Sequence, residues 1–411
     1  MKNLTITTLP IEALTPYARN TRLHSKNQIN KIAKSIQAFG FITPVLIDED
    51  NNLIAGHGRA LAAQQLKLID IPCVTITHLS DDQIKAYRIA DNRIALDSSW
   101  DNDLLKVELS CLIEHEVNID LTGFETPELD LLLLADAVDD DTAHNIIPAF
   151  DVSIGDLWAL GDHRLLCGDA IDSSGYKKLL GDTVVDMLFS DPPYNVPIKG
   201  FVSGNGEVVH KNFAMAAGEM SEDDFIAFLH ESLTLSSEYM AADSIAYLFM
   251  DWRHLHNLIE VGSSVFDRYL NLCVWDKGRG GMGSFYRSQH EMIAIFSKGK
   301  HQNNIALGKY GRNRTNVWSY PGVSSLKQED RELLHAHPTV KPLTLLSDAI
   351  LDCTKRGAVI LDPFLGSGST LLAAEQVGRV AYGIEIDPHY ASVALTRFEQ
   401  MTGITPIKLN D

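Results

Sequence analysis

The chain has 411 residues, of which hydrophobic side chains make up 45% and charged side chains 22%. This composition is that of a globular protein and excludes a disordered chain, and the length predicts two or three domains. Asp and Glu (54) outnumber Lys and Arg (35), which gives a formal net charge of −19. A chain this acidic does not bind a polyanion through its bulk charge, so any contact with nucleic acid must be local.

The sequence also bears on the compartment. No apolar stretch approaches the roughly 18 residues that span a bilayer. The amino-terminal residues lack the apolar core of a secretory signal, and the five cysteines show no pairwise spacing. We therefore expect a reduced, cytoplasmic protein without a membrane span. His290-Glu291 lacks the second histidine of a zinc motif, so we expect no metal site.

The first predicted unit covers residues 1–95 and is a small α/β domain. Apolar residues recur with a helical period over 28–39, and 44–47 is typical of a short buried strand. Gly56-His57-Gly58-Arg59 then opens a second helix. Residues 96–150 are predicted to form a helical segment and an acidic linker; 96–134 could supply helices, but no helix-turn-helix module is evident.

The second predicted unit covers residues 151–411. Strand-like and helical stretches alternate in it, which predicts a doubly wound, mostly parallel sheet of the Rossmann-like α/β class. The predicted strands are 184–190, 358–362 and 380–386, and the predicted helices are 343–354, 370–377 and 389–401.

A glycine-containing turn lies between the strand at 358–362 and the next helix. Gly366 and Gly368 let the backbone approach a ligand closely, and the helix start offers free N–H groups. No Lys-Ser/Thr follows the second glycine, so triphosphate binding at this turn is not supported. Glu385 ends the next strand, where a carboxylate can accept both hydroxyls of a ribose. Taken alone, the turn and the acid fit a cofactor site or a structural turn equally well.

A second motif decides between these readings. Asp191, Pro192, Pro193 and Tyr194 directly follow a buried strand, at the sheet edge where open α/β folds bind ligands. The Asp191 carboxylate and the Pro192 carbonyl can accept the two hydrogens of an exocyclic amine while the Tyr194 ring stacks on the base. The nitrogen lone pair is then free to attack an electrophilic methyl group.

One segment differs in charge from the rest of the chain. Residues 277–314 carry eight basic side chains against one acid, Glu291, and they are interleaved with aromatic and glycine residues. This combination suits contact with phosphates and bases, although a solvated basic loop is the alternative. We assign phosphate contacts to Lys309, Arg312 and Arg314, base-edge contacts to Arg279 and Arg287, and include Lys277 in the DNA-binding set.

These motifs resemble those of S-adenosylmethionine-dependent amino DNA methyltransferases, over roughly residues 151–411. Asp-Pro-Pro-Tyr resembles the catalytic motif and Phe364-Leu-Gly-Ser-Gly368 the cofactor motif; their permuted order resembles class β, which places target recognition between them, at about 275–331. The resemblance implies these cofactor-binding residues: Asp169, Thr339, Lys341, Phe364, Gly366, Ser367, Gly368 and Glu385.

The resemblance implies an enzyme of a bacterial or phage cytoplasm that methylates N6 of a flipped adenine at a specific site in duplex DNA, in the manner of restriction-modification systems. Asp at position 191 favours adenine over N4 of cytosine, which stays open as an alternative. Pairing of two chains and the existence of a cognate nuclease also stay open.

Residues 1 to about 95 resemble the ParB/sulfiredoxin-like fold. In partition proteins the corresponding Gly-x-x-Arg loop binds nucleotide phosphates, which implies a nucleotide site at Gly56, His57 and Arg59. An accessory role in positioning DNA and a structural role are the alternatives for this domain. For the whole chain, a nucleotide-dependent DNA-binding protein with an accessory methylase half is the rival hypothesis.

Overall fold

The computed structural model describes residues 4–115, 117–133, 146–195, 220–280, 286–300, 307–308, 312–321 and 341–409. The chain forms two compact units, Met1–Leu133 and Leu134–Asp411. Among the described residues, no helix is both long enough and apolar enough to cross a membrane.

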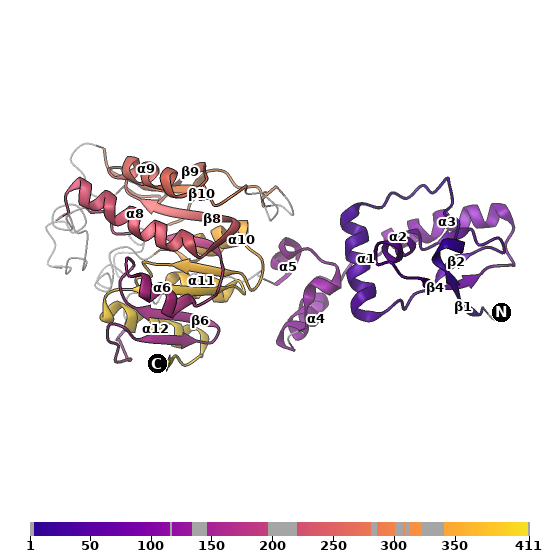
Figure 1. The fold of residues 1–411 in the computed structure, drawn as a ribbon, viewed down its shortest axis with the longest axis horizontal. Coiled ribbons are helices and arrows are strands. Elements are labelled where there is room, and N and C mark those ends of the chain that lie inside the picture. Colours follow the sequence, from indigo (N-terminus) through magenta and orange to yellow (C-terminus); the bar gives the residue numbers. More distant parts are fainter. Residues whose placement is uncertain are drawn as a thin grey trace. The chain divides into compact units, whose positions relative to one another are not determined.

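The first unit begins with a small mixed sheet and its helices (Figure 1). Its strands, as far as they are described, are β1 (Ile6–Pro10), β2 (Val45–Ile47), β3 (Leu53–Ala55) and β4 (Asp70–Thr75), in the order β1-β4-β2-β3. Its helices are α1 (Lys26–Phe39), α2 (His57–Gln65), α3 (Asp81–Ile94), α4 (Asn102–Glu114) and α5 (Thr126–Leu133), with short 3₁₀ turns at Ile11–Ala13, Ala95–Asp97 and Ile119–Thr122.

Local sequence explains where these helices start. The Ser25 hydroxyl accepts a hydrogen bond from the Gln28 N–H at the start of α1, and Ser80 and Gln83 form a capping box at the start of α3. The predicted helix over 28–39, the strand over 44–47 and the helix that opens after Gly56 are all present.

The second unit is built on one large sheet. The described part of this sheet has ten strands in the order β11-β9-β10-β8-β7-β12-β13-β6-β5-β14. The strands are β5 (Leu157–Leu160), β6 (His163–Cys167), β7 (Val185–Ser190), β8 (Met240–Met250), β9 (Arg268–Asp276), β10 (His290–Ser297), β11 (Val317–Ser319), β12 (Val359–Asp362), β13 (Val380–Glu385) and β14 (Ile407–Leu409). The helices are α6 (Ser173–Leu180), α8 (Glu222–Glu238), α9 (Leu255–Val265), α10 (Leu343–Cys353), α11 (Ser369–Gln376) and α12 (Pro388–Thr402).

The strand directions confirm the predicted fold class and limit its parallel part. The five central strands, β8, β7, β12, β13 and β6, run parallel to one another. On both sides the sheet continues through antiparallel pairs: β8 with β10 and β10 with β9 on one side, and β6 with β5 and β5 with β14 on the other. The predicted strands and helices of this unit lie within one or two residues of their observed bounds.

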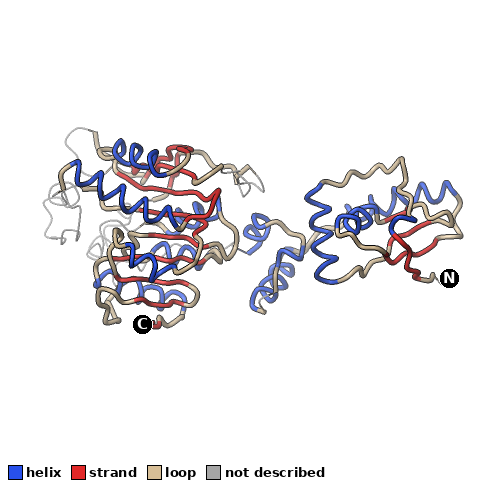
Figure 2. The backbone as a smooth tube through the Cα atoms, viewed as in Figure 1, coloured by secondary structure: helices blue, strands red, loops and turns tan. Residues whose placement is uncertain are grey.

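Helices pack on both faces of this sheet (Figures 1 and 2). One apolar cluster joins the sheet to α10, α11 and α12, and a second joins the opposite face to α6, α8 and α9. Neighbouring residues of one strand therefore divide between the two clusters: Phe189 belongs to the first and Leu188 to the second, and Ile360 and Leu361 divide in the same way. Burial on both faces fixes the position of the strand ends that carry the polar residues below.

Candidate active site

The Asp-Pro-Pro-Tyr segment leaves the carboxyl end of β7 and lines a pocket. Asp191, Pro192, Pro193 and Tyr194 all contribute to its wall. Because β7, β12, β13 and β6 are adjacent and parallel, their carboxyl ends meet at the same edge of the sheet. The pocket lies at that edge, where we expected ligands to bind.

The glycine turn after β12 forms another wall of this pocket. Phe364, Gly366 and Ser367 line it, and Gly366 has a positive φ of 56°. Gly368 has a different role, since it is not among the pocket-lining residues. It caps α11 with a φ of 82°, and a Cβ there would lie 2.8 Å from the Cβ of Ala394 in α12. The second glycine thus permits α11 to pack closely against α12.

Glu385 ends β13 and accepts a hydrogen bond from the glycine turn. Its Oε2 accepts a hydrogen bond from the Gly366 N–H at 2.8 Å, and its Oε1 accepts one from the Asp387 N–H at 2.9 Å. Burial raises the pKa of Glu385 to about 7. Asp169, after β6, also lines the pocket, and its Oδ1 accepts a bond from the Ile171 N–H.

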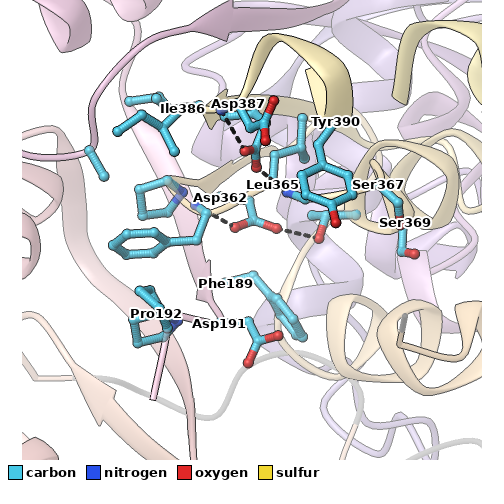
Figure 3. A pocket seen from close by; sticks show the side chains of 18 of the residues that line it. Phe189, Asp191, Pro192, Asp362, Leu365, Ser367, Ser369, Ile386, Asp387 and Tyr390 are labelled. Atoms are coloured by element: carbon cyan, nitrogen blue, oxygen red, sulfur yellow. Dashed lines mark hydrogen bonds between the residues drawn. The ribbon is translucent and has the colours of Figure 1, made fainter. Parts of the chain in front are cut away.

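Asp362 is a site residue that our reading of the sequence missed. It ends β12, lines the pocket, and accepts hydrogen bonds from the Thr370 hydroxyl at 2.6 Å and the Phe364 N–H at 3.1 Å. Burial raises its pKa to about 7. Figure 3 shows Asp191 and Asp362 facing the same space. The signal was present in the sequence, because Asp362-Pro363 repeats the acid-proline pair that follows β7.

Lys341, which lines the pocket, forms ion pairs with two acids, Asp191 and Glu291. Its Nζ lies 2.5 Å from Asp191 Oδ2 and 3.2 Å from Glu291 Oε2, and its side chain is 7% exposed. We expected Lys341 on the cofactor side because of its motif, but its ion pairs join it to the Asp-Pro-Pro-Tyr segment. Burial raises the pKa of Asp191, and the Lys341 ammonium acts in the opposite direction.

Glu291 in β10 completes this network and was also missed. Lys277 Nζ donates to its Oε1 at 2.5 Å. Burial alone would raise the pKa of Glu291, but the ammonium groups of Lys341 and Lys277 lower it to about 2. Lys277, which we assigned to DNA, therefore pairs with a buried acid that also contacts Lys341. No sequence spacing links these side chains, because β9 and β10 bring Lys277 and Glu291 together and a distant loop supplies Lys341.

The other arginines that we predicted to bind DNA divide into two groups. Arg312 and Arg314 are largely buried and form ion pairs with Asp348 and Asp352 of α10. Because these carboxylates neutralise their charges, the structure favours an anchoring role for them over the predicted phosphate contacts. Arg279 and Arg287, in the connection between β9 and β10, are exposed. Two further predicted site residues, Lys309 and Thr339, lie outside the described residues.

In the first unit, the predicted nucleotide-binding residues lie at the start of α2. Gly56 caps the helix with a φ of 95°. His57 and Arg59 are half-buried, and together with Arg88 they have buried nitrogens without a hydrogen-bond partner: His57 Nε2, Arg59 Nε and Arg88 Nε. Burial lowers the pKa of His57, and the charges of Arg88 and His24 lower it further. Cationic groups thus gather around one helix start.

No group of three or more metal-ligating side chains converges in the part of the chain that the structure describes. Carboxylates, aromatic rings, backbone groups and Lys341 line the pocket.

Comparison with known proteins defines the class to which this site belongs. Residues 185–396 match the family model described as DNA methylase. This match spans the Asp-Pro-Pro-Tyr segment, the glycine turn and Glu385, and it covers over half of the chain. The chain belongs to this DNA methylase family.

Individual relatives agree with this family. The Type II methyltransferase M.HpaI of Haemophilus parainfluenzae is 25% identical over 58% of this chain and 74% of its own length. The DNA adenine methyltransferase YhdJ of Escherichia coli is 28% identical over 57% of this chain and 82% of its own length.

The first unit matches different families. Residues 1–93 match the ParB N-terminal domain, which confirms the predicted ParB-like domain. The ParB-like nuclease domain-containing protein YnaK of Escherichia coli is 44% identical over 20% of this chain and 94% of its own length.

Residues 103–153 match the ParB-methyltransferase HTH domain, so our inference that no helix-turn-helix module is evident after residue 95 was wrong. The helices that we left unassigned, α4 and α5, lie in this match. α4 has 13 residues and α5 has 8, and a 3₁₀ turn lies between them. No extended run of helically spaced apolar residues therefore marks the module in the sequence.

Proposed function

We propose that this DNA methylase transfers the methyl group of S-adenosylmethionine to N6 of an adenine flipped out of duplex DNA. The observation that carries the proposal is that the Asp-Pro-Pro-Tyr segment, the glycine turn and Glu385 line one pocket. A base and a methyl donor that share this pocket would meet without a covalent enzyme intermediate. The adenine specificity of YhdJ, a relative, also supports adenine as the target.

The residues of the pocket fit S-adenosylmethionine. Glu385 has both oxygens engaged by backbone N–H groups, and each oxygen can accept one more hydrogen, as a ribose diol offers. Asp169 would accept from the adenine amine, and Phe364, Ile386 and Tyr390 supply apolar surface. Asp191, Asp362 and Glu385 outnumber Lys341 in the lining, which suits a cationic sulfonium. When bound, S-adenosylmethionine supplies an electrophilic methyl group.

The protein's own contribution to the reaction is hydrogen bonding and orientation. The Asp191 carboxylate and the Pro192 carbonyl accept the two hydrogens of the adenine amine, which directs its lone pair towards the methyl group. The Tyr194 ring stacks on the base. The two prolines stiffen the segment, so the acceptors stay where β7 places them. The base must leave the duplex to enter this pocket.

The test is a methylation assay with isotope-labelled S-adenosylmethionine and duplex DNA, followed by digestion to nucleosides and mass spectrometry. We expect N6-methyladenine from the wild-type protein and none from Asp191→Ala, with duplex affinity nearly unchanged. Asp182→Ala, in an exposed turn ahead of β7, is the matched control and should stay active. If the product is N4-methylcytosine, the target base is cytosine and not adenine. An Asp191→Ala rate above about a tenth of the wild-type rate would show that Asp191 has no role in the reaction.

A second candidate function concerns the first unit. We propose that it binds the phosphates of a nucleotide at the start of α2. The unpartnered Nε–H groups of Arg59 and Arg88 favour this, because a buried donor without a partner is costly and an anion would satisfy it. Calorimetric titration of the full chain with nucleoside triphosphates tests the proposal, and the absence of binding heat at millimolar nucleotide would contradict it.

A further inference from the structure

The hydroxyl of Tyr194 lies between two carboxylates. Its oxygen is 2.6 Å from Asp191 Oδ1 and 3.3 Å from Glu291 Oε2. A phenol has one hydrogen, so it donates to only one of these acceptors at a time. The shorter distance assigns that hydrogen to Asp191 in this structure. The other oxygen of Asp191, Oδ2, accepts from Lys341 at 2.5 Å.

Both oxygens of Asp191, the carboxylate proposed to bind the target amine, therefore already accept hydrogen bonds from strong donors. An adenine amine that reaches Asp191 must displace one of them or share an oxygen with it. Lys341 is the harder group to displace, because it is 7% exposed and lies between Asp191 and Glu291. Moving a buried ammonium away from its partners leaves charges unpaired in the interior. The Tyr194 hydroxyl is neutral, and it can leave Asp191 by turning to another acceptor.

Glu291 is held ready as that acceptor. It is 6% exposed, and its Oε1 is bound by Lys277 at 2.5 Å. This leaves Oε2 facing both Lys341 and Tyr194, at 3.2 Å and 3.3 Å. Glu291 stays ionised because two ammonium groups contact it. The ion-pair network consists of two acids, Asp191 and Glu291, and two lysines, Lys277 and Lys341, so its carboxylates and ammonium groups are equal in number.

We propose that Glu291 is a positioning residue: it takes over the Tyr194 hydrogen bond when the target amine binds Asp191, and it keeps Lys341 in place on the other oxygen. The proton stays on Tyr194 throughout, so only the acceptor of its hydrogen bond changes. The exchange frees Asp191 Oδ1 without leaving a buried hydroxyl unsatisfied. It also keeps both oxygens of Asp191 bonded before a base arrives. This inference rests on the proposed function.

The test is a double-mutant cycle on single-turnover methylation, with Glu291→Gln measured in the wild-type and the Tyr194→Phe backgrounds of the full-length protein. Gln keeps the shape of Glu291 but weakens it as an acceptor for the phenol. We expect Glu291→Gln to slow methyl transfer by about tenfold or more in the wild-type background. Its effect should shrink at least about threefold in the Tyr194→Phe background, which has no hydroxyl to redirect.

Two controls separate positioning from damage. Glu260→Gln, on the exposed side of α9, removes the same charge far from the network and should leave the rate unchanged. The S-adenosylmethionine affinity of Glu291→Gln should stay close to wild type, since the proposed defect appears only with a base bound. Its melting temperature should fall, because the variant loses the ion pairs of Glu291 with Lys277 and Lys341, so all rates are compared at a temperature at which every variant is folded. If Glu291→Gln does not fold, Glu291→Asp, which keeps the charge and retracts the oxygens by one methylene, gives the same comparison.

The outcomes are distinct. An unchanged rate in Glu291→Gln, or an equal loss with and without the Tyr194 hydroxyl, would overturn the role of Glu291 while wild-type methylation of adenine still supported the proposed function. If the wild-type protein methylates no base, the proposed function fails and this inference fails with it.

Discussion

At the scale of single residues, burial changes the ionisation of two acids in the pocket. Asp362 and Glu385 have pKa values raised to about 7, and desolvation is the first cause in both cases. The charge of these two acids near neutral pH therefore depends on what occupies the pocket, and a cationic ligand would favour their ionised forms.

We expect the affinity for S-adenosylmethionine to depend on pH through Glu385. A carboxyl group with a pKa of about 7 is mostly protonated below pH 7 and ionised above it, and only the ionised form accepts from both ribose hydroxyls. Calorimetry should show binding that strengthens from pH 6 to pH 8. Glu385→Ala should weaken binding at pH 8 by roughly 1 to 3 kcal/mol, the cost of losing charge-assisted bonds. Equal affinity in the variant would make Glu385 a purely structural acid.

Residue-scale prediction succeeded where the signal was local. Asp191 and Glu385 each follow or end a buried strand, so the strand pattern alone placed both at one edge of the sheet. It missed Glu291 and the ion pair of Glu291 with Lys341, because ion pairs between β10 and a loop ahead of α10 depend on how separate segments pack. The phosphate contacts predicted for Arg312 and Arg314 have the same origin: nothing in the sequence shows that Asp348 and Asp352 of α10 form ion pairs with them.

At the scale of elements, the contact between α11 and α12 determines how the glycine turn is held. Gly368 permits this contact, since a Cβ there would meet Ala394. Arg397 of α12 adds a second support: its Nη1 donates to the Ser367 carbonyl at 3.1 Å and the Ser369 hydroxyl at 2.8 Å. The turn is therefore braced from the helix behind it.

Gly368→Ala should destabilise the protein more than Gly403→Ala, measured by thermal or denaturant unfolding. Both glycines have a positive φ, 82° and 73°, so both variants suffer a backbone penalty of roughly 1 kcal/mol. Only at Gly368 does the new methyl group meet another helix, whereas nothing lies within 4 Å of the position at Gly403. The difference between the two variants measures the packing clash, and equal losses would show that α12 yields freely.

The arginines between β9 and α10 lead to a prediction about the salt dependence and the sequence preference of DNA binding. Breaking a buried ion pair costs roughly 3 to 5 kcal/mol, so Arg312→Gln should lower the free energy of unfolding while the slope of log affinity against log salt stays the same. Arg279→Gln with Arg287→Gln should instead relax the preferred sequence with little change in slope, because base-edge contacts release few counterions. A flatter slope for Arg312→Gln would return this residue to the phosphate contacts.

At the scale of the whole molecule, the chain joins a ParB-like unit and a methylase unit that each have their own apolar core. The sequence predicted both units because each carries its own motif and its own hydrophobic pattern. It did not reveal the helix-turn-helix match over residues 103–153, which begins in the first unit and includes α5.

Separate cores predict that a change in one unit leaves the chemistry of the other intact. Arg59→Ala in the full chain should abolish nucleotide binding, because it removes one of the cationic groups at the start of α2, while the single-turnover rate of methylation stays at the wild-type value. The two are measured by calorimetry and by transfer of labelled methyl. Arg19→Ala, in the same unit, is the control for loss of one charge. A slower methylation rate in Arg59→Ala alone would show that the units are coupled.

The order of the strands has a consequence for folding during synthesis on the ribosome. β12 and β13 lie in the middle of the sheet, between β7 and β6, yet they are among the last strands to be synthesised. Until residues 359–385 have emerged, β6 and β7 have no partner between them, and their unpaired edges are exposed to other chains. A nascent chain that stops before residue 359 would hold the Asp-Pro-Pro-Tyr segment without the sheet that orients it. The pocket therefore forms only after synthesis has passed β13 and Tyr390.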